Sequence, residues 1–203
     1  EVVTALAGLQ QVLGPPDILV NNAGIGAAGA VATMQVSAIE RVMQVNYLGM
    51  VYATKAVLPG MLRRGRGHVV NMASVGGRFA APGEAAYSAT KFAIVGFTQA
   101  LALELHHAGV GVSLIDPGPV DTGFFDNRGA DYQRRWPRKV SASRVASAVV
   151  DAVDRGRLEV FVPSWYRAVG IVQAAMPGVL RAVPPSVFGI VPDPEIHEPA
   201  DGP

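Results

Sequence analysis

Residues 17–29 read DILVNNAGIGAAG, a short apolar run followed by two asparagines and a glycine-rich loop. Gly24, Gly26 and Gly29 have the G-x-G-x-x-G spacing of a turn that binds dinucleotide phosphates. Such a turn also needs a helix that opens at its last glycine and an acidic residue about 20 positions further along the chain. Glu40 is the only acidic residue between residues 29 and 83, and it lies inside a helical pattern. The glycine spacing alone therefore does not indicate a pyrophosphate site.

Helix and strand patterns alternate along the rest of the chain. Four segments have apolar residues at helical spacing: residues 1–13, 37–64, 84–107 and 141–153. Ser141 is a typical N-cap for the last of them. Four short apolar runs predict strands: residues 17–21, 68–73, 109–115 and 158–162. Strands that alternate with helices predict an α/β domain built on a parallel sheet.

The composition is that of a globular domain. The chain has 203 residues, of which 50% are hydrophobic and 16% are charged, and its net charge is +1. A charge this small provides no overall field that attracts nucleic acid, so we expect no nucleic-acid partner. The absence of cysteine excludes disulfides and thiolate metal sites, and we expect no metal. No apolar run approaches the length of about 18 residues that a membrane-spanning helix needs, and a cytoplasmic location is the default expectation.

Tyr87 and Lys91 form a Y-x-x-x-K pair in the predicted helix 84–107. Residues four positions apart lie on one helix face, so the ammonium can reach the phenol and lower its pKa. A tyrosine tuned in this way can exchange a proton with a substrate oxygen near neutral pH. Such a pair alone is also typical of a surface lysine beside a packed tyrosine. Ser74 follows the predicted strand 68–73, at the end of a parallel strand where ligands bind.

Five motifs, in the same order and at the same spacing, resemble those of the short-chain dehydrogenase/reductase family. They are Asn21-Asn22-Ala23-Gly24 after a strand, Asn46 with Gly49, Ser74 thirteen residues before Tyr87, the Tyr87/Lys91 pair, and Pro117-Gly118 followed by Val120 and Thr122. The resemblance covers about residues 1–165. It implies a Rossmann-type fold, a doubly wound parallel sheet with helices on both faces.

The resemblance also implies an activity: hydride transfer between NAD or NADP and an alcohol or ketone substrate. It assigns catalysis to Asn46, Ser74, Tyr87 and Lys91. In the family the tyrosine is the acid or base, the serine polarises the substrate oxygen, and the lysine tunes the tyrosine and binds the nicotinamide ribose. The asparagine interrupts its helix and holds a water that links the lysine to solvent. Cofactor binding is assigned to Asn22, Ala23, Gly24, Tyr87, Lys91, Pro117, Gly118, Val120 and Thr122.

The sequence departs from the family pattern in one respect. A T-G-x-x-x-G-x-G turn after a first strand is absent from it, so we expect the N-terminal βαβ units of the fold to be missing from these residues. Two functions remain open. The chain is part of an oxidoreductase, or it is a catalytically incompetent remnant that acts as an interaction module.

Three segments beyond the motifs carry further expectations. Residues 121–140 are predicted to cover the substrate, with four aromatic residues in an apolar pocket: Phe124, Phe125, Tyr132 and Trp136. The apolar residues 166–190 form a C-terminal extension that caps the pocket, builds a dimer surface or lies on a membrane. Residues 191–203 have no Lys or Arg and are predicted to be a disordered tail.

The two long helices, residues 37–64 and 84–107, are expected to build a homodimer or homotetramer. The family commonly pairs these helices across a two-fold axis. Helix 84–107 carries apolar residues around more of its circumference than one sheet can cover: Phe92, Val95, Phe97, Leu101 and Leu103. A helix that is apolar on most sides must bury its second side, and a subunit interface does so.

Overall fold

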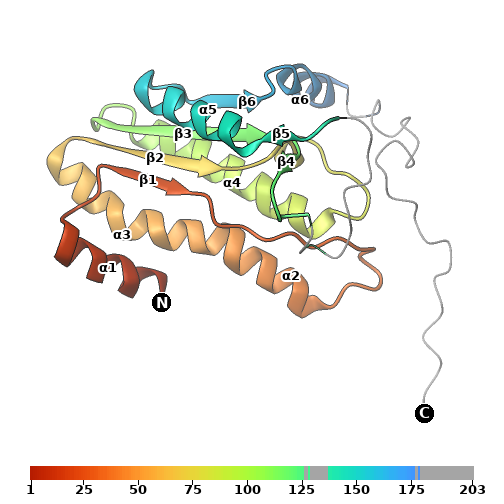
Figure 1. The fold of residues 1–203 in the computed structure, drawn as a ribbon, viewed down its shortest axis with the longest axis horizontal. Helices are drawn as coiled ribbons and strands as arrows, with labels where there is room; N and C mark the ends of the chain where they lie inside the picture. The colour runs from red at the N-terminus through yellow and green to blue at the C-terminus, as the bar shows by residue number, and fades with distance from the viewer. Residues whose placement is uncertain (126–127, 129–136, 177, 179–203) are drawn as a thin grey trace, which may run out of the picture.

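A parallel sheet forms the centre of the described chain, with its strands in the spatial order β1-β2-β3-β6 (Figure 1). The computed structural model describes residues 1–125, 128, 137–176 and 178. The strands of this sheet are β1 (Ile18–Asn21), β2 (Gly67–Met72), β3 (Val110–Pro117) and β6 (Glu159–Val162), and a small second sheet pairs β4 (Val120–Asp121) with β5 (Val140–Ser141). The helices are α1 (Val2–Leu13), α2 (Val36–Met43), α3 (Gly49–Arg64), α4 (Ala85–Glu104), α5 (Ala142–Asp154) and α6 (Tyr166–Ala175). The predicted α/β fold with a parallel, Rossmann-type sheet is confirmed.

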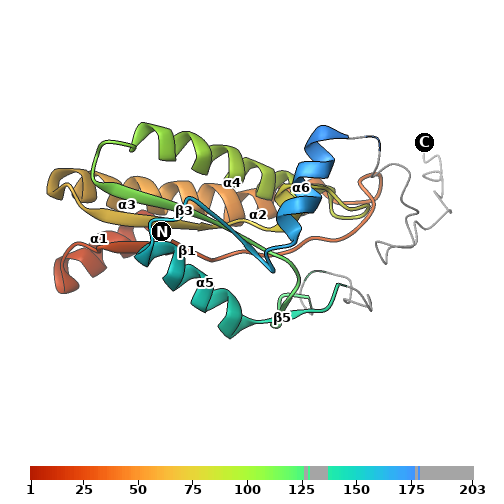
Figure 2. The same ribbon diagram turned by 90° about the horizontal axis from the view of Figure 1, so that it is seen from above.

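Helices cover both faces of this sheet, with α3 and α4 on one face and α5 on the other (Figure 2). Successive residues of a strand point to opposite faces, so Val69 packs in the core under α3 and α4 while Val70 packs against α5. The same alternation directs Leu114 toward α4 and Ile115 toward α5. It also determines which side chains at the strand ends can reach the helix that carries Tyr87.

The long helix predicted at residues 37–64 is divided by a π-helical turn, Gln44–Leu48. Asn46 lies in this turn and is buried, and its side chain is hydrogen-bonded to the backbone of Ile25 in the loop after β1. A π-helical turn inserts one residue into a helix and is frequent at functional sites. The apolar periodicity on either side of the turn is that of an ordinary helix, so it gives no signal of the turn.

Buried amides and hydroxyls join β1 and β2 to the helices above them. The Asn21 Nδ2 donates to Asn71 Oδ1 at 2.8 Å and to Thr54 Oγ1 at 3.1 Å. The Asn71 Nδ2 in turn donates to Thr98 Oγ1 at 2.9 Å. Buried polar groups are tolerated when they are paired in this way, and this network fixes the first asparagine of the NNAG motif to the sheet.

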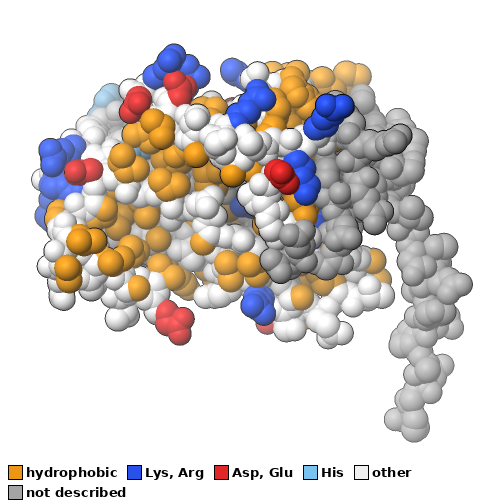
Figure 3. All heavy atoms as spheres, viewed as in Figure 1, with side chains coloured by type: hydrophobic (Ala, Val, Ile, Leu, Met, Phe, Trp, Pro, Cys, Tyr) orange, Lys and Arg blue, Asp and Glu red, His pale blue; other side chains and the backbone are white. Residues whose placement is uncertain are grey.

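The face of β1 opposite α3 is exposed to solvent. Ile18 and Val20 are 50% and 43% exposed, although a parallel strand is usually buried on both faces. Figure 3 shows hydrophobic side chains gathered on this side of the molecule, over β1 and α1. The opening adjoins the cavity described below, which Val20 lines.

Part of the predicted C-terminal extension is a helix. Residues Tyr166–Ala175 form α6, whereas the sequence predicted only an apolar segment there. Residues 177 and 179–190 of the extension, the tail 191–203, and Tyr132 and Trp136 of the predicted substrate-covering segment lie outside the described residues. Ser141 is the N-cap of α5 as predicted, because its Oγ accepts a hydrogen bond from the Arg144 amide.

Candidate active site

A cavity of about 1060 Å³ lies at the carboxyl ends of the strands. Parallel sheets bind their ligands at this edge. The residues that the motifs single out and that line the cavity are Asn22, Gly24, Ser74, Tyr87, Lys91, Pro117, Gly118, Val120 and Thr122. Ala23 lies between two of them in sequence and is exposed. The structure therefore brings motifs from four separate segments to one space, while Asn46 of the fifth motif does not line the cavity.

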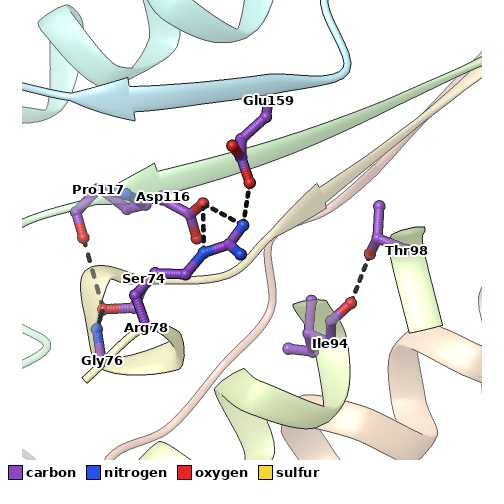
Figure 4. Close-up of polar contacts among 8 residues, drawn as sticks. All are labelled: Ser74, Gly76, Arg78, Ile94, Thr98, Asp116, Pro117 and Glu159. Carbon is purple, nitrogen blue, oxygen red and sulfur yellow. Dashed lines mark hydrogen bonds and ion pairs between the residues drawn. The ribbon is translucent and has the colours of Figure 1, made fainter. Parts of the chain in front are cut away.

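Ser74 is held at the end of β2 by two backbone contacts. Its Oγ accepts a hydrogen bond from the Gly76 amide at 3.0 Å and donates one to the Pro117 carbonyl at 3.4 Å (Figure 4). The short 3₁₀ turn that follows packs directly on α4, since a Cβ at Gly77 would lie 2.8 Å from the Lys91 carbonyl oxygen. The serine is thereby fixed between the Pro-Gly segment and the helix of Tyr87.

Tyr87 lies in the first turns of α4, with its ring at the cavity. Burial raises its pKa to about 12, while a hydrogen bond with Ser74 acts in the opposite direction. The ring packs against Phe124, with the two ring centres 5.5 Å apart. The expectation that Lys91 lowers this pKa is not met, because desolvation outweighs every favourable contact. In this state the phenol is protonated at neutral pH.

Lys91 is buried one turn further along α4. Its Nζ lies 5.6 Å from the centre of the Tyr87 ring and donates a hydrogen bond to the Met72 carbonyl at 2.9 Å. Burial lowers the Lys91 pKa to about 8, and the Asp116 carboxylate acts against this shift. The lysine is thus a cation held in a largely apolar place, where its charge acts strongly on neighbours.

Asn46 reaches the same region from the π-helical turn. Besides its two contacts to Ile25, its Nδ2 donates to Thr90 Oγ1 at 3.2 Å, and that hydroxyl donates to the Tyr87 carbonyl at 2.7 Å. A Cβ placed on Gly24 would lie 3.4 Å from Asn46 Oδ1 and 3.9 Å from Lys91 Nζ. Glycine at this position keeps the space beside both polar groups open.

The Pro117-Gly118 segment ends β3 and borders the cavity. The Gly118 amide donates to the Val162 carbonyl at 2.8 Å, and the Tyr166 ring of α6 occupies the place where a Cβ at residue 118 would stand. Tyr166 is buried and stacks on Trp165, with ring centres 3.9 Å apart. Three roles were expected for the C-terminal extension: capping the pocket, building a dimer surface or lying on a membrane. Its described part forms a wall of the cavity, which corresponds to the first of these roles.

Phe124 and Phe125 line the cavity as expected from the sequence. Arg128 lies on the same side, where its guanidinium pairs with Glu84 at 2.5 Å and stacks on Phe125 at 4.7 Å. Its carbonyl accepts a hydrogen bond from the Ala28 amide at 2.9 Å. Arg128 therefore contacts both the loop after β1 and Glu84, the N-cap residue of α4.

An ion-pair cluster beside Ser74 was not predicted. The Arg78 guanidinium binds the Asp116 carboxylate of β3 and Glu159 of β6. Its members are distant in sequence and have no recognisable spacing, so no pattern along the chain could have identified the cluster. The only sequence signal is an aspartate placed directly before the Pro-Gly motif.

The G-x-G-x-x-G spacing of Gly24, Gly26 and Gly29 does not begin a helix in the structure, since α2 starts only at Val36. Among the described residues no group of three or more His, Asp or Glu side chains is arranged to hold a metal ion. In the same part of the chain, no helix is long and apolar enough to cross a membrane.

Known proteins resemble this chain in sequence. The model of the short chain dehydrogenase family matches residues 1–133. Mouse Dehydrogenase/reductase SDR family member 7B is 36% identical over 174 residues, a match that covers 80% of this chain and 54% of the mouse protein. The 3-ketodihydrosphingosine reductase of Bacteroides thetaiotaomicron is 44% identical over 115 residues, which cover 57% of this chain and 43% of the reductase. The chain thus spans about half the length of these relatives.

Solved structures resemble it in fold. A short chain dehydrogenase/reductase from Burkholderia phymatum in complex with NAD has a TM-score of 0.77 at 25% identity, covering 91% of this chain and 73% of that one. A short-chain dehydrogenase from Sphingobium yanoikuyae in complex with NADPH has a TM-score of 0.74 at 25% identity, covering 91% and 74%. Since the family model matches well over half of its residues, this chain belongs to the short-chain dehydrogenase family.

Proposed function

We propose that this chain is part of an oxidoreductase that transfers a hydride between NAD or NADP and an alcohol or carbonyl substrate. One observation carries the proposal: Ser74, Tyr87 and Lys91 meet at a single cavity on the carboxyl edge of the sheet. These residue types are those that polarise, protonate and electrostatically support a substrate oxygen. No observation on the described residues favours the alternative of an inactive interaction module.

The cavity suits the nicotinamide half of such a cofactor. Lys91 Nζ and the open side of Gly24 face one space, and the Pro117–Thr122 segment borders the same cavity. Lys91, Gly24 and the backbone of Pro117-Gly118 would hold the nicotinamide ribose and ring, with Asn22, Ala23, Val120 and Thr122 around them. The bound cofactor supplies or accepts the hydride.

The proton is assigned to the Tyr87 oxygen. With its pKa raised to about 12 by burial, the phenol carries a proton at neutral pH and can donate it to a carbonyl oxygen as the carbonyl carbon is reduced. Ser74 Oγ would donate its hydrogen bond to the same oxygen in place of the Pro117 carbonyl. Lys91 stabilises the phenolate that results, and Asn46 positions the loop and the helix turn around it.

An apolar substrate fits the lining of the cavity. Beside the catalytic residues, its wall is built from hydrophobic side chains that include Phe79, Phe124, Phe125, Trp165 and Val169. A human relative, 42% identical over 116 residues, is named Retinol dehydrogenase 8. Together with the ketodihydrosphingosine reductase, this name supports a lipid-like alcohol or ketone as the substrate class.

We also propose that α4 forms a subunit interface. Of the apolar residues that surround this helix, Val95 and Leu101 are buried inside the subunit. Phe92 and Leu103 remain 46% and 80% exposed, so apolar side chains are present on the outward face of α4.

The test is an assay of the whole protein with NADH or NADPH and a series of apolar ketones and aldehydes. Tyr87→Phe removes the proton donor and little volume, so kcat should fall by at least a hundredfold while cofactor binding is nearly unchanged. Tyr52→Phe, at an exposed tyrosine of α3, is the matched control and should retain full activity. A Tyr87→Phe variant as active as the wild type would contradict the proposal.

A further inference from the structure

Arg78 joins three elements at the edge of the cavity. It follows the turn that carries Ser74, and its guanidinium lies between Asp116 of β3 and Glu159 of β6 (Figure 4). The Arg78 Nε and Nη2 both bond to Asp116 Oδ2, at 3.2 and 2.9 Å. Asp116 directly precedes Pro117, whose carbonyl accepts the hydrogen bond from Ser74. The ion pair therefore connects the backbone on both sides of the Ser74 contact.

Asp116 faces the helix of Tyr87 and Lys91. Strand alternation places it on the same sheet face as Leu114, which packs in the core with Ile94 and Val95 of α4. It is fully buried, and within the described part of the chain its Oδ1 has no hydrogen-bond partner. A buried carboxylate with one oxygen unpaired is costly, so the charge of Asp116 depends on nearby cations.

The charges around Asp116 balance only when Lys91 is included. The charged groups that face it are Arg78 from the Ser74 turn, Glu159 from β6 and Lys91 from α4. Two carboxylates and one guanidinium leave one negative charge, and the Lys91 ammonium offsets it. Burial raises the Asp116 pKa to about 6, with Arg78 acting in the opposite direction, so the group is ionised at neutral pH. For Lys91 the facing ionisable groups are Asp116 and, from its own helix, Tyr87.

We propose that Asp116 and Arg78 are positioning residues of this site. The Arg78–Asp116 ion pair fixes the Ser74 turn against the Pro117-Gly118 segment, and the Asp116 carboxylate keeps the buried Lys91 in its charged form. The inference rests on the proposed function for its effect on turnover, while the effect on Lys91 is independent of any reaction.

The Lys91 titration tests the electrostatic part directly. The chain has three lysines, Lys55, Lys91 and Lys139, so the Cε signal of each can be followed against pH by NMR of lysine-labelled protein. Asp116→Asn should lower the Lys91 pKa by about one pH unit, because it removes a neighbouring negative charge. Lys55 and Lys139 serve as internal references. Asp151→Asn, which removes the ion pairs of Asp151 in α5 with Arg155 and Arg157, is the matched control and should leave the Lys91 pKa unchanged.

The direction in which the Lys91 pKa changes distinguishes an electrostatic role of Asp116 from a purely structural one. If Asp116 only braced the fold, its replacement would admit water and raise the Lys91 pKa toward the ordinary value. Glu159→Gln, at a partly exposed position, removes a carboxylate that faces Asp116 and not Lys91, so the Lys91 pKa should stay nearly unchanged. Asp116→Ser removes the same carboxylate as Asp116→Asn with a smaller side chain and keeps the test decisive if Asp116→Asn fails to fold. A Lys91 pKa that is unchanged or raised in a folded Asp116 variant overturns the proposal.

Turnover provides the second readout. With the Lys91 pKa lowered from about 8 to about 7, the charged fraction at pH 8 falls about fivefold and at pH 6 hardly at all. Asp116→Asn should therefore lose about fivefold more activity at pH 8 than at pH 6. Arg78→Lys keeps the charge but not the two-point contact, so it should reduce kcat/KM equally at both pH values. A wild type without oxidoreductase activity would refute the proposed function, yet the Lys91 titration would still decide the role of Asp116.

Discussion

Asn46 and Ile25 are joined by two hydrogen bonds that run in opposite directions. The Ile25 amide donates to Asn46 Oδ1 at 2.8 Å, and Asn46 Nδ2 donates to the Ile25 carbonyl at 2.9 Å. One side chain thus pairs with both backbone polar groups of a residue that lies 21 positions away. The pairing explains two features together: the π-helical turn that presents Asn46, and the fixed course of the loop after Gly24.

Asn46→Ala should destabilise the fold and reduce turnover. It leaves the Ile25 amide and carbonyl without their partner, at a cost to the free energy of unfolding of about 2–3 kcal/mol. Gln44→Ala, at an exposed position of the same turn, is the matched control and should change stability by less than about 0.5 kcal/mol. Urea unfolding of the two variants measures the difference, and equal midpoints would show that the contact contributes little.

Lys91→Met should abolish activity and yet stabilise the protein at pH 7. The folded pKa of about 8 lies below the ordinary 10.5, so the folded state disfavours the charged lysine. The stability that this depressed pKa contributes is present above 10.5 and is lost as pH falls through 8. At neutral pH the buried charge therefore costs about 3 kcal/mol, which the Met variant recovers.

Urea unfolding at several pH values checks both the sign and the window. The advantage of Lys91→Met over the wild type should shrink as pH rises from 8 to 10.5. Lys55→Met removes an exposed lysine and should show no such trend. A Met variant that is less stable than the wild type at pH 7 would mean that contacts of the ammonium outweigh its desolvation.

Gly77→Ala should disturb the site through the backbone alone. Its Cβ would stand 2.8 Å from the Lys91 carbonyl oxygen, inside van der Waals contact, so the Ser74 turn must move away from α4. We expect a loss of about 1–3 kcal/mol in unfolding free energy, as for other overpacked sites, and a clear fall in kcat. Gly8→Ala in α1 meets open space and should be neutral or slightly stabilising. Thermal unfolding measures the effect on stability, and the ketone assay measures the effect on kcat. A Gly77→Ala variant that is as stable and as active as Gly8→Ala would contradict the prediction.

The sequence predicts best where a residue's role depends on short-range spacing. Tyr87 and Lys91 share a helix face, and Ser74 ends a strand, so each could be located from the pattern around it. The alternation of strands and helices likewise fixes the parallel sheet. These features are local, or they follow from rules that connect local elements.

Features that depend on contacts between distant segments could not be predicted in this way. Burial, to which the Phe124 ring contributes, is the largest influence on the Tyr87 pKa, and the spacing of Tyr87 and Lys91 does not show it. Asp116 and Arg78 meet only because β3 and the Ser74 turn end side by side. The wall that Tyr166 forms depends on where α6 lies, and apolar composition alone left three options for that segment.

The exposed face of α4 leads to the last prediction, which concerns assembly. Six of its exposed residues recur at helical spacing and are small or apolar: Ala85, Ala89, Phe92, Gly96, Ala100 and Leu103. Gln99 and Glu104 are exposed beside them. Gly96 faces open space, so a second helix could approach its backbone closely. A two-fold contact would pair this face with itself and bury Phe92 and Leu103.

Light scattering of the whole protein at micromolar concentration should report a dimer or tetramer. Leu103→Glu should shift the protein toward monomer because dimer formation would bury unpaired charges. Val31→Glu, at an exposed apolar residue outside the long helices, should leave the mass unchanged. A monomeric wild type would refute the interface and leave the exposed apolar face of α4 without a partner.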